Sequence, residues 1–149
     1  MKISSISDSE LLSEYVRRFT IAAGERIQSA KQAADHLRGF FKEGAKRELF
    51  AVVFLNNQNQ LLDTEILFRG SINTSAVFPR EVVERVIALG AGALILGHNH
   101  PSGNNTPSSS DRAVTKKLKT ALSAIDVEVL DHIIIGGSDY FSFADNHLI

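Results

Sequence analysis

"ALILGHNHPSGNNTPSSSD", residues 93–111, joins a short apolar run to two histidines and a polar loop. The run at 93–97 has the length and composition of a buried strand. Side chains alternate along a strand, so the imidazoles of His98 and His100 fall on one face. Two neutral imidazoles on the same side of a strand are suitable zinc ligands. The stretch therefore predicts a metal site where a strand of an α/β fold ends.

A carboxylate downstream of the turn completes the expected ligand set. Pro101 and Gly103 turn the chain, and Asp111 arrives in the first turn of the helix that follows. Two imidazoles and one carboxylate leave one tetrahedral position for water, as in a catalytic zinc site. Each half alone has a simpler interpretation, because histidines commonly end strands at sheet edges and Ser108 with Asp111 resembles a capping box. Their combination in one stretch favours the metal.

Hydrophobic periodicity predicts the rest of the fold. Some segments carry apolar residues at helical spacing, and others are compact runs of apolar, β-branched and aromatic residues. We expect one α/β domain, a single mixed β-sheet flanked by helices, in which N-terminal helices (1–46) pack on the main part of the chain (47–149). The expected helices are 7–19, 29–43, 79–90 and 108–124, with Gly44 ending the second, and the expected strands are 48–55, 61–70, 93–97, 127–137 and 140–145.

The composition of the chain limits its chemistry. Among its 149 residues, 44% are hydrophobic and 22% charged, as in globular proteins. There is no cysteine, so zinc must be held by His, Asp or Glu, and zinc nucleobase deaminases, which need a cysteine pair, are excluded. A net charge of -1 offers no general attraction to nucleic acid. Neither a signal peptide nor an apolar run of about 20 residues is evident, so we expect a cytoplasmic protein without a membrane partner.

Several short stretches carry a family resemblance. The two histidines, Ser108 and Asp111 match the JAMM (MPN-plus) metalloprotease signature, spacing included. The stretches "HNHPSG", "TPS", "FPREVV" and "DHIIIG" look like the RadC family, the bacterial branch of that fold, and the similarity runs from about Arg47 to Phe143. The resemblance implies a cytidine-deaminase-like (JAB/MPN) fold in which one Zn2+ per chain is held by the two histidines and Asp111, with water as the fourth ligand.

The resemblance also implies two catalytic residues. Glu48, which opens the first expected strand, matches the family's glutamate and would be the general base, taking a proton from the zinc-bound water and delivering it to the leaving amine. Ser108 would hydrogen-bond the oxyanion of the tetrahedral intermediate. The residues alone leave the choice of base open, because Glu65 and Glu81 are equally good carboxylates by sequence.

Three functions are compatible with these features. The first is a zinc-dependent metallopeptidase or isopeptidase that hydrolyses an amide bond of a peptide or protein substrate. The second is a RadC-like module associated with DNA repair or nucleic acid, without significant peptidase turnover, which the net charge and the lack of an aromatic and basic platform disfavour. The third is a binding platform that has lost its metal ligands, although every ligand position is filled here. We predict the first, without a prediction for its substrate or oligomeric state.

Other polar residues receive a structural interpretation. His132, in an apolar strand, is expected to be a hydrogen-bonded core histidine beside the site rather than a ligand. His36 and His147 have no evident partner. One expected helix carries cations at positions i, i+4 and i+7, a face that is solvated or meets an acidic peptide or a phosphate backbone. These cations are Arg112, Lys116 and Lys119.

Overall fold

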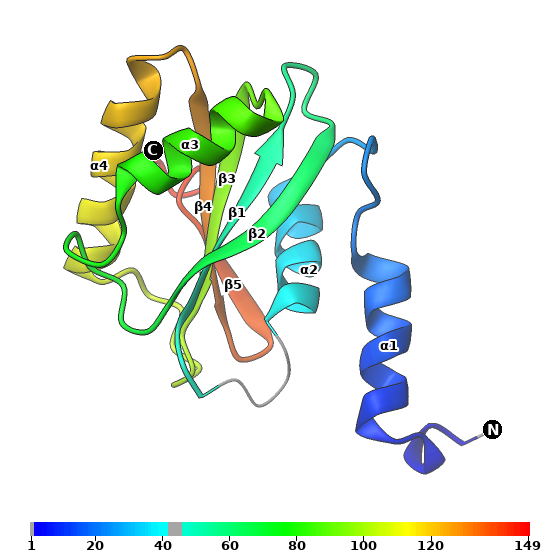
Figure 1. Cartoon of the computed structure of the whole chain (residues 1–149). Coiled ribbons are helices and arrows are strands. Elements are labelled where there is room, and N and C mark those ends of the chain that lie inside the picture. The colour runs from blue at the N-terminus through cyan, green and yellow to red at the C-terminus, as the bar shows by residue number, and fades with distance from the viewer. Residues whose placement is uncertain (1, 42–45) are drawn as a thin grey trace.

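The computed structural model describes residues 2–41 and 46–149, which form a mixed five-stranded sheet flanked by helices (Figure 1). The strands are β1 (Leu49–Leu55), β2 (Leu61–Arg69), β3 (Ala93–Asn99), β4 (Glu128–Gly136) and β5 (Asp139–Ser142), and the helices are η1 (Ile3–Ser5, 3-10), α1 (Asp8–Phe19), α2 (Ala30–Phe40), α3 (Pro79–Leu89) and α4 (Ser109–Ser123). The sheet order is β2-β1-β3-β4-β5, with β3 and β4 parallel and the other neighbours antiparallel. Helix α4 connects the parallel pair. This is the predicted α/β architecture.

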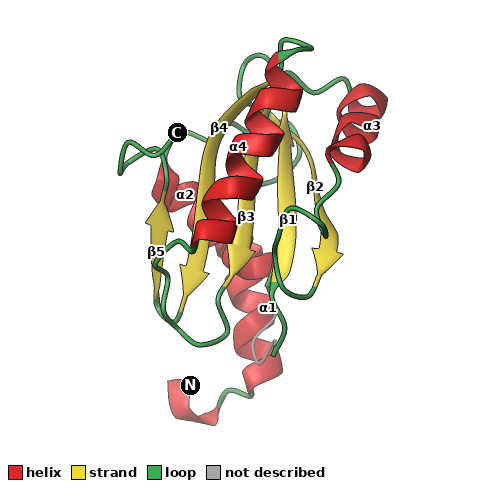
Figure 2. Ribbon diagram, turned by 90° about the vertical axis from the view of Figure 1, so that its left-hand side faces the viewer, coloured by secondary structure: helices red, strands yellow, loops and turns green. Residues whose placement is uncertain are grey.

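The sheet carries an apolar core on each face. On one face, α3 and α4 pack on alternate residues of the central strands, including Phe50 and Leu96. On the other face, α2 packs through Leu37 on the remaining residues, such as Val53 and Ile95. Figure 2 shows α4 in front of the sheet and α2 behind it. Burial on both faces explains why the central strands read as continuous apolar runs.

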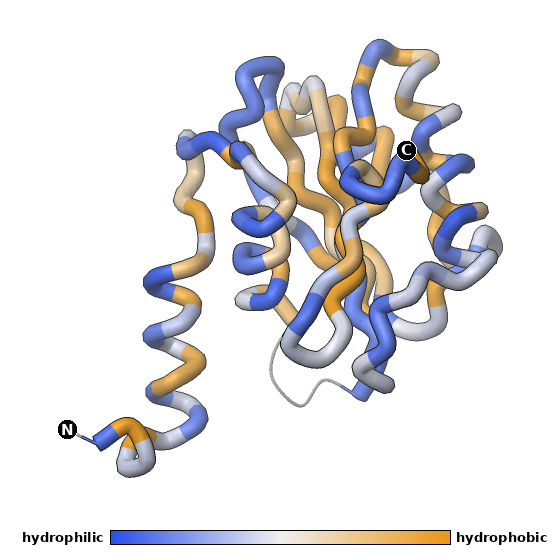
Figure 3. Tube along the Cα trace, turned by 180° about the vertical axis from the view of Figure 1, so that it is seen from behind, coloured by the Kyte–Doolittle hydropathy of each residue, from blue (hydrophilic) through white to orange (hydrophobic). Residues whose placement is uncertain are grey.

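Helix α1 lies on the far side of α2 from the sheet (Figure 3). It is attached there by the Tyr15 hydroxyl, which donates to the carbonyl oxygen of Asp35 at 2.8 Å. The apolar stripe predicted on this helix stays partly open to solvent, with Leu11 52% and Phe19 44% exposed, and no residue of α1 is buried. The N-terminal segment thus contributes one helix that covers a face of the sheet, α2, and one helix at the periphery, α1.

Local capping chemistry sets the helix ends. At the start of α1, the Ser7 side chain accepts from the Glu10 backbone N–H and the Glu10 carboxylate accepts from the Ser7 N–H, which is a complete capping box. Helix α3 begins with Pro79, whose missing N–H costs nothing in a first turn. It ends at Gly90, which has φ 69° and so adopts the left-handed conformation that glycine tolerates.

Three predicted boundaries are wrong by a few residues. Helix α2 ends at Phe40, before the predicted residue 43, because Phe41 leaves the helical conformation; the predicted stop at Gly44 lies outside the described residues. Strand β3 continues to Asn99 instead of stopping at 97, because its last residues still pair with β4. Strand β5 ends at Ser142 instead of 145, where the chain enters a turn.

The topology determines where a site can form. The carboxyl ends of the parallel strands β3 and β4 meet at one edge of the sheet, which is the usual position of ligand sites in open α/β sheets. Helix α4 begins at this same edge after the loop that follows β3. Within the described ranges, no helix combines the length and apolar character that crossing a lipid bilayer requires.

Candidate metal centre

Three side chains converge between the end of β3 and the start of α4. His98 and Asp111 are buried, whereas 13% of the His100 side chain is exposed. The Nε2 atoms of the two histidines are 2.9 Å apart. Each lies 3.2 Å from one oxygen of the Asp111 carboxylate, Oδ1 for His98 and Oδ2 for His100. The structure therefore brings the three predicted ligands together.

Asp111 serves both the helix and the site. Its Oδ2 accepts from the Ser108 backbone N–H at 2.8 Å, and its own N–H donates to Ser108 Oγ at 3.0 Å. The capping box and the ligand set thus share one carboxylate and do not exclude each other. Burial alone would raise the pKa of Asp111, but the neighbouring imidazoles of His98 and His100 and the Ser108 backbone N–H hold that pKa well below its usual range. The carboxylate is therefore ionised at neutral pH.

A backbone carbonyl fixes the tautomer of His100. The Nδ1 atom of His100 lies 2.6 Å from the carbonyl oxygen of Asn104, in the loop between β3 and α4. A carbonyl oxygen only accepts, so Nδ1 carries the proton. Neutral His100 then presents the lone pair of Nε2 to the Asp111 carboxylate.

A chain of hydrogen bonds fixes the tautomer of His98. The Thr115 hydroxyl donates to the Asp111 carbonyl oxygen at 2.7 Å, so Thr115 Oγ1 accepts from His132 Nδ1 at 2.6 Å. Burial lowers the pKa of His132 well below its ordinary value, so this ring is neutral and its Nε2 has no proton. That nitrogen accepts from His98 Nδ1 at 2.7 Å. Neutral His98 therefore also presents the lone pair of Nε2.

This donor set fits a zinc ion. Zinc bonds of about 2.0 to 2.1 Å place ligand atoms roughly 3.3 Å apart in a regular tetrahedron. The separations here are 2.9 Å between the imidazole nitrogens and 3.2 Å from each to the carboxylate. Adjacent lone pairs and an ionised carboxylate repel one another unless a cation lies between them. The three residues thus have the ligand atoms and the spacing to hold a metal ion.

Glu48 lies just before β1, the strand that pairs with the ligand-bearing strand β3. Strand β1 pairs antiparallel with β3 so that Phe50 lies opposite His98. Continuing this register by two residues brings Glu48 opposite His100, on the same face of the sheet. The Oε2 atom of Glu48 accepts from the Ile72 backbone N–H at 3.0 Å. Its Oε1 atom accepts no hydrogen bond from the described residues.

Asn99, between the two ligand histidines, clamps the segment that carries Glu48. Its Oδ1 accepts from the Leu49 backbone N–H at 2.6 Å, and its Nδ2 donates to the carbonyl oxygen of Arg47 at 3.1 Å. Both residues next to Glu48 are therefore tied to the end of β3. Sequence patterns predicted only that the Asn99 side chain points away from the histidines and did not identify this clamp.

Ser108 lies at the exposed start of α4, next to a ligand in the structure as in the sequence prediction. Its Oγ accepts from the Asp111 N–H, and within the described parts of the chain its hydroxyl hydrogen is donated to no other residue. This hydrogen is available to a bound molecule.

Of the residues that hydrogen-bond to the ligand histidines or to their partners, only one was predicted from the sequence. His132 is the buried, hydrogen-bonded core histidine that its place in an apolar strand predicted. Thr115 and Asn104 were not identified. Thr115 carries no distinctive sequence signal, and Asn104 acts through its backbone carbonyl, which every residue type possesses.

His36 lies in α2, across the sheet from this centre. Its Nδ1 accepts from the Ile21 backbone N–H at 2.8 Å, and its Nε2 lies 2.8 Å from Thr64 Oγ1. The structure therefore gives His36 two partners that were not evident from the sequence. Both partners come from segments remote in sequence, which pattern alone does not connect.

Comparisons with known proteins identify the family of the chain. The chain matches the family described as RadC-like JAB domain over residues 27–148. It is 51% identical over 106 residues to the UPF0758 protein YeeS of Escherichia coli (strain K12), covering 71% of this chain and 72% of that protein. It is 43% identical over 139 residues to the UPF0758 protein YfjY of the same strain, covering 93% of this chain and 84% of that protein.

Other relatives are longer. A UPF0758 protein of Actinobacillus pleuropneumoniae serotype 5b (strain L20) is 50% identical over 103 residues, which are 69% of this chain but 47% of that protein. The chain thus spans about half the length of several curated relatives that it matches. The family match covers α2, α3 and all five strands, and it includes both ligand-bearing elements, β3 and α4. The chain belongs to the family of RadC-like JAB-domain proteins.

Proposed function

We propose that this protein is a zinc-dependent hydrolase that cleaves an amide bond of a peptide or protein, either a peptide bond or an isopeptide bond. The observation that carries the proposal is the convergence of His98, His100 and Asp111, in which the Nδ1 atom of each imidazole has a hydrogen-bond partner and each Nε2 atom faces the carboxylate. A structural zinc site usually uses four protein ligands, whereas three ligands leave a position at which chemistry can occur. Membership of a JAB-domain family supports the same conclusion.

Each residue around the ligands would have its own role in hydrolysis. Bound zinc would lower the pKa of a coordinated water to about 7 and polarise the substrate carbonyl. Glu48 would take a proton from the attacking water and pass it to the leaving amine, using the Oε1 atom. Asn99 would keep Glu48 at the right distance, because it ties down both neighbouring residues. Ser108 would donate its hydroxyl hydrogen to the oxyanion.

Metal content is the first test of this proposal. Purified wild type, His100→Ala and Asp111→Asn should be compared by elemental mass spectrometry after loading with zinc and dialysis. We expect one zinc per chain in the wild type and its loss from both variants. Asp111→Asn keeps an oxygen that can accept from the Ser108 N–H, so α4 should remain capped. A folded wild type that takes up no zinc would overturn the proposal.

Activity of the Glu48→Gln variant is the second test. Zinc-loaded proteins should be incubated with fluorogenic peptide libraries that contain main-chain amides and lysine ε-amides. We expect Glu48→Gln to keep its zinc and to cleave roughly 100- to 10,000-fold more slowly, the usual contribution of a general base. Glu81→Gln, which changes an exposed carboxylate on α3, is the matched control and should cleave normally. Cleavage that persists in Glu48→Gln would reject Glu48 as the base.

A further inference from the structure

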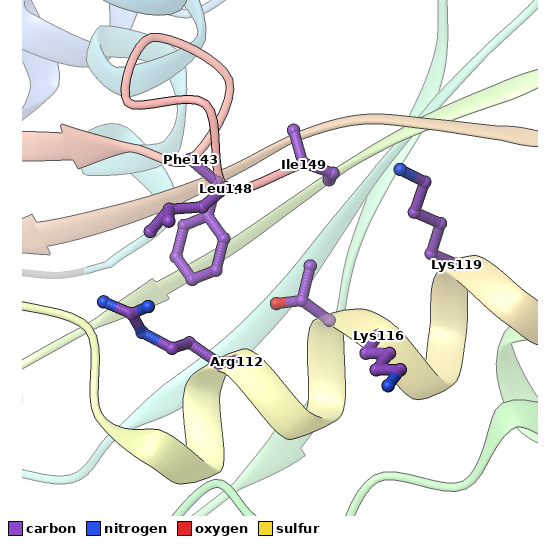
Figure 4. A pocket seen from close by; sticks show the side chains of 7 residues that line it. Arg112, Lys116, Lys119, Phe143, Leu148 and Ile149 are labelled. Atoms are coloured by element: carbon purple, nitrogen blue, oxygen red, sulfur yellow. The ribbon is translucent and has the colours of Figure 1, made fainter.

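A cavity of about 320 Å³ lies between α4 and the C-terminal residues (Figure 4). We call it the α4 groove. Its apolar wall includes Phe143, which is buried, and Leu148, which is 36% exposed. Arg112, Lys116 and Lys119, the cations noted in the sequence, line it from α4.

The α4 groove has three cations among its lining residues, and they form no ion pair within the described residues. None of the three forms an ion pair there, and no acidic side chain lines the cavity. In Figure 4, Arg112 and Lys119 extend toward the C-terminal residues at the two ends of the apolar wall, whereas Lys116 points away from it. Helical rise separates Arg112 from Lys119 by about 10 Å. A ligand that fits here carries negative charge and an apolar group.

One layer of side chains separates the α4 groove from the metal centre. Thr115 lines the cavity and accepts from His132 Nδ1 at 2.6 Å. The ring of Phe143 stacks on the ring of His132, with centroids 4.7 Å apart. His132 in turn is hydrogen-bonded to the ligand His98. The groove and the centre thus lie along the same helix, α4, with one layer of buried side chains between them.

We propose that the α4 groove binds an acidic segment of the polypeptide substrate, close in sequence to the bond that is cleaved. This inference rests on the proposed function and specifies its substrate class. Carboxylates of the segment would pair with Arg112 and Lys119, and an apolar side chain would pack between them on Leu148. Helical rise places Lys119 about 12 Å along α4 from Asp111, a distance that about four extended residues cover. The acidic residues would therefore lie within about four positions of the cleaved bond.

The composition of the groove favours a polypeptide over a nucleic acid. Nucleic-acid affinity comes from many phosphate contacts, but the groove offers three cations on a chain of net charge -1. Single-stranded nucleic acid also needs exposed aromatic rings for stacking, whereas Phe143, the aromatic residue of the groove, is 1% exposed. An apolar wall next to cations instead suits a peptide in which acidic and apolar side chains alternate.

Peptide binding, measured without turnover, tests this inference. Fluorescence anisotropy should be recorded with a labelled peptide of alternating Glu and Leu, with the same peptide carrying Gln for Glu, and with labelled oligothymidine. The proteins are the wild type, Arg112→Gln/Lys119→Gln, and Lys2→Gln/Arg80→Gln, which removes equal charge from exposed positions elsewhere. His100→Ala serves as a fourth protein that lacks one metal ligand but keeps the groove.

We expect the acidic peptide to bind the wild type, the Lys2/Arg80 control and His100→Ala alike, and the Arg112/Lys119 variant on the order of tenfold more weakly. Binding should also weaken as salt is raised. Equal binding of the Gln peptide, or equal binding to the Arg112/Lys119 variant, would overturn the inference. Tighter binding of oligothymidine that depends on the same two cations would overturn it in favour of a nucleic-acid site. A wild type that takes up no zinc would instead reject the proposed hydrolase. The peptide-binding result would not depend on that outcome.

Discussion

Residues that do not face the metal position determine which ring nitrogen of each ligand histidine carries the proton. Thr115 is the clearest case. Its hydroxyl is the acceptor for His132 Nδ1–H, which leaves His132 Nε2 free to accept from His98. Thr115→Val keeps the shape of the side chain and removes this acceptor. We expect zinc affinity, measured by competition with a chromophoric chelator, to fall about 10- to 100-fold, as for other residues that orient metal ligands. Thr115→Ser retains the hydroxyl and should retain the affinity.

A spectroscopic measurement separates this positioning role from a loss of packing. Histidine 15N chemical shifts of the zinc-free protein report which ring nitrogen carries the proton. The wild type and Thr115→Ser should show His98 protonated at Nδ1, and Thr115→Val should populate the Nε2–H form. An unchanged His98 spectrum in Thr115→Val would mean that Thr115 does not control the tautomer, whatever the zinc affinity.

At the residue scale, sequence predicted the three side chains that converge at the candidate metal centre but not the residues that orient them. His98, His100 and Asp111 lie in one stretch, so their spacing along a strand, a turn and a helix start is readable. Their partners come from β4, from the body of α4 and from backbone carbonyls, which no local pattern connects. Glu48 illustrates the limit, since its position relative to the end of β3 depends on the pairing of β1 with β3.

At the element scale, the strands were predictable because burial on both faces leaves apolar runs between polar turns. The ends were less predictable. Strand β3 continues through two polar residues, His98 and Asn99, because their side chains find partners in the site and at β1. The apolar stripe of α1 correctly predicts a helix, yet Phe19 remains 44% exposed because periodicity does not tell how much of a stripe is covered.

The end of β4 supports the loop that orients His100, and this gives an element-scale prediction. A Cβ atom on Gly136 would lie 2.8 Å from the Asn105 backbone nitrogen and 2.9 Å from the Gly103 carbonyl oxygen, so the loop would have to move. The loop carries the Asn104 carbonyl that accepts from His100 Nδ1. We expect Gly136→Ala to weaken zinc binding about 10- to 100-fold and to lower the free energy of unfolding by about 1 to 3 kcal/mol.

Chelator competition and urea unfolding measure the two effects of Gly136→Ala separately. Gly92→Ala is the matched control, because its methyl group would meet the Asn57 side chain at the opposite end of β3. It should lower stability without changing zinc affinity. Equal losses of zinc affinity in both variants would show that general destabilisation, rather than the loop, is responsible.

At the scale of the whole molecule, the fold class followed from the sequence but the strand order did not. A hairpin and alternating strands and helices predict a mixed sheet. The placement of β3 between β1 and β4 instead depends on contacts between segments that are far apart in the sequence. This strand order creates the site. It brings the segment before β1 next to the end of β3, and it lays His132 of β4 beside His98 of β3.

The packing of α2, where His36 contacts Thr64 of β2, also makes folding sensitive to acid. His36 is buried there, with Nδ1 accepting from the Ile21 N–H, and burial lowers its pKa from 6.5 to about 4. Between these values the unfolded chain binds a proton that the folded protein does not, so the free energy of unfolding falls as pH decreases. The stabilisation is complete above pH 6.5 and is lost toward pH 4, by at most about 3 kcal/mol.

Urea unfolding of the zinc-free protein at pH 7.5, 5.5 and 4.5 would measure this effect as the difference between wild type and His36→Gln. His132 has a lowered pKa for the same reason, but it is present in both proteins and cancels in the difference. We expect His36→Gln to be less stable than the wild type at pH 7.5, because a buried site has been altered, and to lose less stability on acidification. His147→Gln, at an exposed position, should follow the wild type. If His36→Gln lost as much stability as the wild type between pH 7.5 and 4.5, proton binding at His36 would not cause the acid sensitivity. The other buried groups would then account for the whole decrease in the free energy of unfolding.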